Sequence, residues 1–387
     1  MVRRAGRSVM AIAVGSAALL LASAVQAVAS PKDHMVQNTG IVMTLPTGPI
    51  TYFDISWVDQ STGQYFLADD SNNAVDWFDA TTDSFARFLA KGQFAGTGIA
   101  ACYAFTPDPY GCAGPTGVVT DNLGRVWAGD SPTTTDPQSS VVMINTATAP
   151  YAFTRINTGG HARSDELSFD PADHMILIAN PDDGFLTWIS TTTLSVVGKF
   201  YYSGNADGAT PTLLNHPAPQ GFEQSSYDPK TGLFYQAVPG VGIDVFKPVP
   251  AGGVGQLVTT FRTPSSLASF CPSGPAGLAV GPRQTLIGTC DNGGIVVNVR
   301  NGRTQTVIPN VGGSDEVWFN PGDGNIYFAQ AGGASPALAV AGGHNDHFLQ
   351  SLPTGTGAHS VAAYSGNNQI FVPVTGVGVL VFQSSGH

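Results

Sequence analysis

Charged residues are scarce in this chain of 387 residues: they make up 11% of it, against about 25% in an average globular protein. Lysine and arginine together number only 16, whereas aspartate and glutamate number 27, so the formal net charge is −11. Lysine and glutamate are among the usual residues of helical surfaces, and their scarcity disfavours a mainly helical fold. An acidic surface also repels phosphate groups, so nucleic acid is not expected as a partner.

Local signatures of several common enzyme classes are also missing. The sequence contains no Gly-x-Ser-x-Gly motif, no His-Glu-x-x-His motif, no P-loop and no dinucleotide-binding glycine motif. These absences disfavour a serine hydrolase, a zincin protease and a nucleotide-dependent enzyme. No apolar run after residue 30 is long enough to cross a bilayer, so we expect no membrane insertion of the mature chain.

The first thirty residues have the pattern of a secretory signal peptide. Three arginines open the chain, at positions Arg3, Arg4 and Arg7. An apolar run from Met10 to Val25 follows, and then Ala27-Val28-Ala29 offers a small-residue cleavage site. The alternative is a retained anchor, but the run is short for a membrane span and no basic cluster follows it. We predict a signal peptide over residues 1–30, a single domain over 31–387, and a secreted or periplasmic protein.

Removal of that segment takes away three arginines and no acid, which leaves 13 basic against 27 acidic residues and a net charge of −14. Four cysteines remain: Cys102, Cys112, Cys271 and Cys290. In an exported protein they are expected to form two disulfides, for which three pairings exist. We favour Cys102–Cys112 and Cys271–Cys290, because each pair is close in sequence and lies within one repeat unit. Free thiols that act as metal ligands or nucleophiles are the alternative.

Glycine (47 residues) and proline (27) are abundant, which favours turns and strands. A short motif recurs among them: small or acidic residues, a short apolar strand, and an Asp-Pro turn. It is clearest in Ser164–Pro171, Phe222–Pro229 and Ser314–Pro321. Weaker copies lie at 53–59, 115–121, 275–282 and 358–364. Further strand patterns follow each copy, bounded by Gly, Asn and Pro, as in Met175–Asn180.

The seven copies are anchored at Asp54, Thr116, Asp165, Glu223, Ala276, Asp315 and His359. Spacings of 39 to 62 residues between these positions fit four-stranded blades with longer loops. We therefore predict an all-β fold, a seven-bladed β-propeller. The last unit runs out of chain after its third strand, so a strand predicted at Gly40–Leu45 should complete that blade and close the ring. An open stack is the alternative, but it would need polar capping units, which the sequence lacks.

The repeats resemble the YVTN-repeat group of exported bacterial propellers, and more distantly NHL-repeat and gluconolactonase-type propellers. The resemblance rests on Leu177–Asn180 followed by a short polar turn, on Gly240–Phe246, and on the Asp-Pro turns. The gluconolactonase-type resemblance implies a central divalent cation held by Glu, Asn and Asp, although that group typically has six blades. Virginiamycin B lyases are similar propellers too, and that resemblance implies a divalent metal and a histidine acid or base on one face.

Equivalent anchors of the blades should converge at one end of the central channel. Four are the carboxylates of Asp54, Asp165, Glu223 and Asp315, and one is the imidazole of His359. Since hard cations take several oxygen ligands, we predict a divalent ion, calcium or magnesium rather than a transition metal, held by Asp165, Glu223, Asp315 and His359. Crowding raises the pKa values of carboxyl groups, which makes Asp165 and Glu223 candidates for acid–base catalysis, and His359 beside them is a third candidate. The alternative is that these acids bond backbone amides or face water.

Other polar residues should reach the same face. His161 and His216 lie in connections that lead into inner strands, and Asp-rich turns at 69–72 and 180–183 would make the rim acidic. We assign ligand binding to Asp54, Glu166, His161, His216 and Glu316. An ordinary loop position is the alternative for each histidine.

Three functions remain open at this level. The favoured one is an exported, monomeric propeller that binds a small molecule, a metal or a protein partner on this face. The second is a metal-dependent lactonase, hydrolase or lyase that uses the same residues, and the third is a structural surface protein. The repeats specify geometry rather than a reaction, so the sequence does not decide whether the chain is an enzyme.

Overall fold

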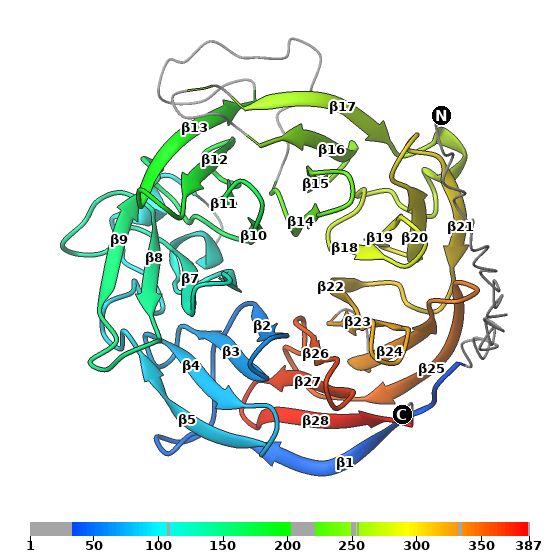
Figure 1. The fold of residues 1–387 in the computed structure, drawn as a ribbon, viewed down its shortest axis with the longest axis horizontal. Helices are drawn as coiled ribbons and strands as arrows, with labels where there is room; N and C mark the ends of the chain where they lie inside the picture. The colour runs from blue at the N-terminus through cyan, green and yellow to red at the C-terminus, as the bar shows by residue number, and fades with distance from the viewer. Residues whose placement is uncertain are drawn as a thin grey trace, which may run out of the picture. The chain divides into compact units, whose positions relative to one another are not determined.

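A computed structural model describes residues 33–106, 109–202, 221–248, 253, 255–331 and 335–385. Within them, seven antiparallel four-stranded sheets are arranged around a central axis (Figure 1). The sheets follow one another around the axis in chain order, which confirms the predicted all-β, seven-bladed propeller. The predicted signal peptide (residues 1–30) and His216 lie outside the described residues.

Each blade is numbered in chain order. Blade 1 contains β2 (Ser56–Asp59), β3 (Gln64–Asp69), β4 (Ala74–Asp79) and β5 (Ser84–Leu89). Blade 2 contains β6 (Val118–Thr120), β7 (Arg125–Asp130), β8 (Ser140–Asn145) and β9 (Phe153–Asn157). Blade 3 contains β10 (Leu167–Asp170), β11 (Met175–Asn180), β12 (Phe185–Ser190) and β13 (Ser195–Tyr201). Blade 4 contains β14 (Ser225–Asp228), β15 (Leu233–Val238), β16 (Gly242–Lys247) and β17 (Gln256–Arg262). Blade 5 contains β18 (Leu278–Gly281), β19 (Thr285–Cys290), β20 (Gly293–Asn298) and β21 (Thr304–Ile308). Blade 6 contains β22 (Ser314–Phe319), β23 (Asn325–Gln330), β24 (Ala337–Gly342) and β25 (His347–Pro353). Blade 7 contains β26 (Ala362–Tyr364), β27 (Gln369–Val374), β28 (Gly378–Ser384) and β1 (Val36–Met43). Three short 3-10 helices lie in loops: η1 (Cys102–Ala104), η2 (Pro109–Cys112) and η3 (Ser265–Leu267).

The N-terminal strand closes the ring. In Figure 1, β1 lies outside β28, with which it pairs antiparallel, so the predicted completion of the last blade is confirmed. The strand begins at Val36, four residues before the predicted Gly40. Its register shifts between Asn38 and Val42, and Gly40 has a φ of 77° there. Gly40 therefore belongs to a bulge inside the strand rather than to its start, because glycine adopts positive φ without a steric penalty.

Apolar side chains packed between neighbouring sheets hold the blades together. The second strand of a blade is covered on both faces, and accordingly five of the six residues of β11 are buried. Trp127 and Ile176 pack together between blades 2 and 3. Tyr65 and Phe371 pack across the closure between blades 1 and 7, with ring centroids 5.2 Å apart. Burying such a side chain contributes roughly 1.5–3 kcal/mol, so closure stabilises the terminal blades as well as the inner ones.

The Asp-Pro motif forms the turn between the first and second strands of a blade. The Asp170 carboxylate accepts hydrogen bonds from the backbone N–H groups of Ala172 (2.8 Å) and Asp173 (3.2 Å). Asp228 accepts the same kind of bond from Lys230 at 3.0 Å. Aspartate favours such turns because its short side chain reaches the backbone two residues on. Each inner strand runs from its anchor to this turn, so anchors and turns lie at opposite ends of the blades.

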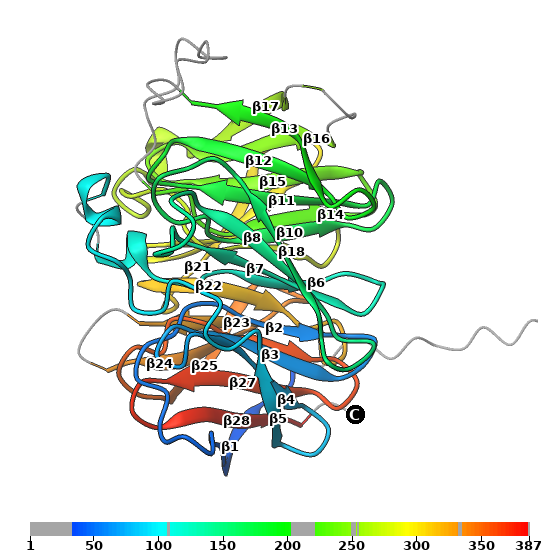
Figure 2. The ribbon, with the colours of Figure 1, turned by 90° about the vertical axis from the view of Figure 1, so that its left-hand side faces the viewer.

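Both favoured disulfides are present, Cys102–Cys112 and Cys271–Cys290, and no described cysteine is free. The first lies in the connection between blades 1 and 2, which carries η1 and η2 and projects from one face of the propeller (Figure 2). Among the described residues, no helix has the length and apolar character needed to cross a membrane.

Candidate binding site at the propeller hub

The anchor residues occupy equivalent positions in the folded chain. The backbone N–H of Asp54 donates to the carbonyl oxygen of Ala68 at 2.9 Å, and that of Asp165 donates to Ala179 at 2.8 Å. Thr116 makes the same bond in blade 2. Each bond joins an anchor to the second strand of its own blade, two residues before the inner strand begins. The anchor side chains therefore start from the same place in each blade and converge at the hub.

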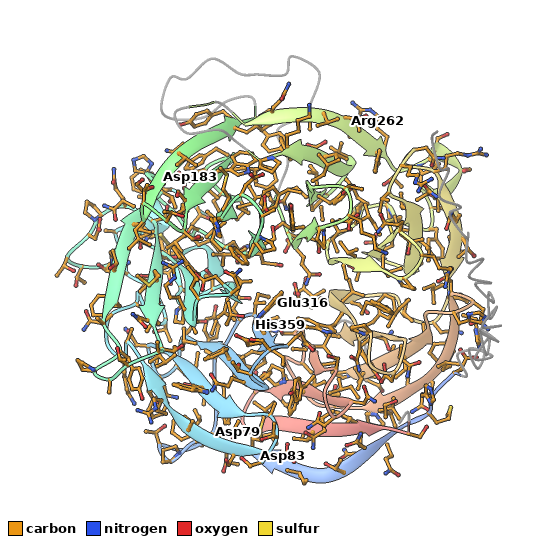
Figure 3. The ribbon with its side chains drawn as sticks, in the orientation of Figure 1. Asp79, Asp83, Asp183, Arg262, Glu316 and His359 are labelled. Carbon is orange, nitrogen blue, oxygen red and sulfur yellow. A yellow bond between two sulfur atoms is a disulfide. The ribbon has the colours of Figure 1, made fainter. Side chains whose placement is uncertain are left out.

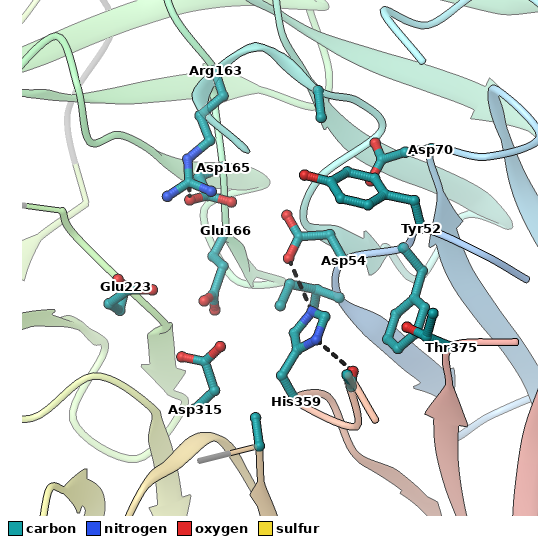
Figure 4. Close-up of a pocket in the computed structure, with 15 residues that line it drawn as sticks. Tyr52, Asp54, Asp70, Arg163, Asp165, Glu166, Glu223, Asp315, His359 and Thr375 are labelled. Atoms are coloured by element: carbon teal, nitrogen blue, oxygen red, sulfur yellow. Dashed lines mark hydrogen bonds and ion pairs between the residues drawn. The ribbon is translucent and has the colours of Figure 1, made fainter. Parts of the chain in front are cut away.

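A cavity of about 390 Å³ lies at this end of the hub (Figure 4). Its size is within the usual range for small-molecule sites. Six residues predicted for the site line it: Asp54, Asp165, Glu166, Glu223, Asp315 and His359. Two other predicted residues do not line this cavity. Glu316 lies at the hub (Figure 3) but outside the lining, and His161 lines a second cavity. Five blades thus contribute side chains to one space.

His359 is held on three sides. Its Nδ1 lies 2.8 Å from the carbonyl oxygen of Gly357, its Nε2 lies 3.6 Å from Asp54 Oδ1, and its ring stacks on Phe53 with centroids 4.9 Å apart. Since Nδ1 donates to the carbonyl, Nε2 also carries a hydrogen toward Asp54 only in the imidazolium form. Burial opposes this charge, but the bond to Asp54 and the charge of Asp315 outweigh it and raise the pKa of His359 to about 9. At neutral pH His359 is therefore a cation.

Arg163 is the second cation of the cavity, and it was not among the predicted site residues. Its Nε lies 3.0 Å from Asp165 Oδ2 and 3.7 Å from Asp182 Oδ2. Burial acts to lower the pKa of Arg163, but the carboxylates of Asp165 and Asp54 raise it by a larger amount, so Arg163 stays charged. One sequence signal could have indicated it: a basic residue in a chain with few of them directly precedes the Ser164–Asp165 anchor.

The carboxylates of Glu223 and Asp315 face the cavity from blades 4 and 6 without such a partner (Figure 4). Among the described residues, no hydrogen bond or ion pair reaches either side chain. Burial and the neighbouring charge of Asp315 raise the pKa of Glu223 well above its usual value, although Arg163 opposes the shift. Burial likewise raises the pKa of Asp315 and takes that of Asp165 to about 7, with nearby acids adding to the effect.

A chain of hydrogen bonds leads from the cavity wall into the hub. The Leu278 N–H donates to Gln224 Oε1 at 2.6 Å, which turns Gln224 Nε2 toward Glu316 Oε2, also at 2.6 Å. Glu316 in turn shares a hydrogen bond with Glu166, and two carboxyl groups can do so only when one is protonated. Burial and surrounding acids raise the pKa of Glu316 to about 8 and that of Glu166 well above its usual value. The pair therefore holds a proton at pH 7.

The rim of the cavity adds Asp70, which follows β3, together with Tyr52 and Thr375. Asp70 is 3% exposed, and its Oδ1 accepts no hydrogen bond from any described residue. Burial, followed by the charges of Asp54 and other acids, raises its pKa well above the usual value. Of the turn residues 69–72 that were predicted to make the rim acidic, Asp70 therefore lines the cavity, as a buried carboxyl group with one oxygen that has no hydrogen-bond partner among the described residues.

The predicted divalent ion can be compared with this geometry. Ligands of a single Ca²⁺, Mg²⁺ or Zn²⁺ must each lie within about 2–2.6 Å of it. In the part of the chain that the structure describes, no three His, Cys, Asp or Glu side chains are arranged to hold one ion. Two of the four predicted ligands, Asp165 and His359, also face a charged partner already. The donor set as it stands does not fit a divalent ion, and the metal site stays a prediction.

Comparison with known proteins supports the fold and no more. No family model matches the chain, and no curated protein matches it either. Among solved structures, hydrazine synthase of Kuenenia stuttgartiensis is similar, with a TM-score of 0.61 and 13% identity over 91% of this chain and 99% of that one. A streptogramin B lyase structure is similar with a TM-score of 0.61 and 8% identity, over 92% of this chain and 99% of that one. At these identities the likeness concerns the propeller architecture, in line with the predicted resemblance to virginiamycin B lyases as a fold.

Proposed function

We propose that this chain is a binding propeller whose hub cavity holds the positively charged group of a small organic molecule, such as a primary amine. The observation that carries the proposal is the excess of carboxyl groups over cationic side chains in the lining. Six carboxyl groups meet only two cations there: Asp54, Asp70, Asp165, Glu166, Glu223 and Asp315 against Arg163 and His359. Both cations already face acids, so the surplus is concentrated at Glu223, Asp315 and Glu166 on one side of the cavity (Figure 4).

An organic cation suits this lining better than a bare divalent ion. An ammonium group donates up to three hydrogen bonds in different directions and does not need all its partners within one coordination sphere. Charge-assisted hydrogen bonds of this kind are roughly twice as strong as neutral ones. A bound ammonium group would also stabilise the ionised form of these acids, whose pKa values are raised first by burial and then by the neighbouring charges.

Titration calorimetry with n-butylamine and the matched neutral n-butanol tests the proposal, at pH 8 so that the cavity acids are more fully ionised. We expect the amine to bind and the alcohol to bind at least about tenfold more weakly, since hydrogen bonds to charged groups contribute about 1.5–3 kcal/mol. Glu223→Gln and Asp315→Asn should each weaken the amine by about tenfold or more. Asp173→Asn, which removes an exposed carboxylate at the opposite end of blade 3, should leave binding unchanged. Equal binding of amine and alcohol, or no binding of either, would refute the proposal.

Acid–base catalysis in the same cavity is the second candidate function. The favouring observation is the Asp54–His359 pair, an imidazolium that is stacked on Phe53 and lines the cavity beside protonated carboxyl groups. Such a group can donate a proton to a leaving oxygen in hydrolysis or elimination. A lactone panel tests this: turnover that is lost in His359→Gln but kept in Asp173→Asn would establish an enzyme. Absence of turnover by the wild-type chain would remove this candidate.

We further propose that the chain works outside the cytoplasm, in the periplasm or the medium. The basic and apolar pattern of residues 1–30 and the two disulfides support this, because disulfides persist in oxidising compartments. Fractionation of the producing cells, with N-terminal sequencing of the recovered chain, tests it. A chain that starts near residue 31 in an extracytoplasmic fraction is expected, and a full-length cytoplasmic chain would contradict the proposal.

A further inference from the structure

A second cavity, of about 570 Å³, lies near the hub site, since His161 in its wall is two residues from Arg163 in the hub lining. Apolar side chains form much of its wall, including Ile99, Phe105, Pro132 and Pro137, and His161 closes one side. Phe105 is 58% exposed even though it is a large apolar residue. The volume is again in the range of small-molecule sites, which are mostly apolar with a few placed polar groups.

His161 has a fixed orientation in this cavity. Its backbone N–H donates to both carboxylate oxygens of Asp183, at 3.0 and 2.9 Å, and its Nδ1 lies 3.5 Å from Asp183 Oδ1. The imidazole stacks on Phe105, with ring centroids 4.7 Å apart and an angle of 27° between the planes. Among the described residues, none forms a hydrogen bond or an ion pair with His161 Nε2. The cavity therefore offers a flat aromatic wall with one open polar atom.

The cavity is preformed, because its loop is fastened at several points. The Cys102–Cys112 disulfide bridges the segment that carries η1, and Ile99 packs on this bridge. The backbone N–H of Arg163 donates to the Gly111 carbonyl oxygen at 2.8 Å, which ties the same segment to blade 3. A wall held in this way keeps an apolar hollow open to solvent rather than letting it collapse, and binding to a preformed site needs little ordering.

The two cavities share a boundary made of two short segments. His161 lines the second cavity and Arg163, two residues later, lines the first; their Cα atoms are at most about 7 Å apart. The consecutive acids Asp182 and Asp183 likewise contact one residue of each cavity: Asp182 lies beside Arg163, and Asp183 lies beside His161. A ligand that occupied both cavities would have to cross this boundary, which is only a few residues wide.

We propose that the second cavity binds the aromatic ring of the ligand whose ammonium group occupies the hub, so that the ligand class is an arylalkylamine. This inference rests on the proposed function. The ring packs against Phe105 and His161, and the alkyl linker crosses the boundary between His161 and Arg163. Aromatic rings bury a large apolar area and stack favourably on such a wall, whereas the surplus acids recognise the charged end.

Calorimetry with ω-phenylalkylamines of one to six methylene groups, each compared with the n-alkylamine of the same chain length, tests the inference. At the best linker length we expect the phenyl compound to bind about tenfold more tightly, as partial burial of a ring contributes. Phe105→Ala should abolish that gain and leave n-alkylamine binding unchanged. Tyr103→Ala is the matched control: Tyr103 is also an exposed aromatic residue of this loop, at 42%, but it does not line the cavity.

Benzyl alcohol, a neutral ring compound, separates this inference from the proposed function. It should bind to the wild type and to Glu223→Gln, and be lost in Phe105→Ala. If alkylamines bind but a phenyl group gives no gain and Phe105→Ala has no effect, the inference is overturned while the proposed function stands. If benzyl alcohol binds but no amine does, the bipartite ligand is overturned together with the hub proposal, and binding of neither compound overturns both.

Discussion

Replacing Glu316 with glutamine tests whether the hub stores protons at neutral pH. In the folded chain, burial is the main cause that raises the pKa of Glu316 from 4.5 to about 8, and the charges of Asp315 and Asp54 add to it. The hydrogen bond with Glu166 and the charge of His359 act in the opposite direction. Between pH 4.5 and 8 the folded state therefore binds a proton at Glu316 that the unfolded state has released. Stability must fall as pH rises through this window.

The size of the effect follows from the two pKa values. Each pH unit between them costs about 1.4 kcal/mol for one group, so Glu316 alone lowers the free energy of unfolding by about 3 kcal/mol between pH 5 and pH 7. That is a large part of the roughly 5–15 kcal/mol by which domains are stable. The amide that Glu316→Gln introduces can still accept a hydrogen bond from Gln224 and donate one to Glu166, so the variant keeps the hydrogen-bond chain without the titrating group.

Urea unfolding followed by tryptophan fluorescence at pH 5, 6, 7 and 8 measures this, with the disulfides intact. The wild type should lose stability toward pH 8, and Glu316→Gln should match it at pH 5 but exceed it by about 3 kcal/mol at pH 7. Raised pKa values at Glu166, Glu223 and Asp165 give the variant a residual slope of the same sign. Asp173→Asn should run parallel to the wild type. A wild-type midpoint that is flat or rises from pH 5 to 8, or a Glu316→Gln curve parallel to the wild type, would refute the reasoning.

Two further predictions concern the scaffold. Cys102→Ser combined with Cys112→Ser should lower the free energy of unfolding by about 3 kcal/mol, the loop-closure value for a loop of about 11 residues, and should weaken benzyl alcohol binding more than n-butylamine binding in calorimetry. Equal stability of the variant would show that the bridge does not constrain the unfolded chain. Deletion of Val36–Met43 should uncover the edge of β28 and lead to self-association, which light scattering would detect. Ile41→Thr, at a 41% exposed position of the same strand, is the control and should stay unassociated; a deletion variant that is equally unassociated and stable would show that β1 is dispensable.

The blade register was predictable because its signals are local and repeated. The Asp-Pro turns depend on a carboxylate that bonds backbone two or three residues away, as at Asp170, and such short-range chemistry is visible in sequence. Once the turns are aligned, the anchors five residues earlier fall into equivalent places, and Asp54, Asp165 and Glu223 line one cavity as a consequence. The early start of β1 was not predicted, because Gly40 resembles a strand boundary when its bulge is not visible.

The rest of the site depends on loops that do not repeat. Arg163 is held by ion pairs with Asp165 and Asp182. No rule of sequence spacing predicts that the segment leading into blade 3 meets the turn after β11. The second cavity likewise arises from the long connection before blade 2, folded back against residues 132–137 and His161. The failure of the predicted metal ligands to form a coordination sphere has the same origin. Sequence indicates the ring position of a side chain but not the exact placement of its oxygen or nitrogen atoms, on which coordination of an ion depends.

Closure of the ring and construction of the site are linked through blades 1 and 7. Asp54 belongs to the segment that leads into blade 1, His359 to the segment that leads into blade 7, and Phe53 stacks on His359 across the same seam. Deeper in the hub, the backbone N–H of Ser56 donates to Ser360 Oγ at 2.9 Å. These contacts join residues about 300 positions apart, and they are made only when blades 1 and 7 pack against each other. The cation at His359 therefore depends on closure, because an opened seam would separate the imidazole from Asp54 and return its pKa toward the ordinary value.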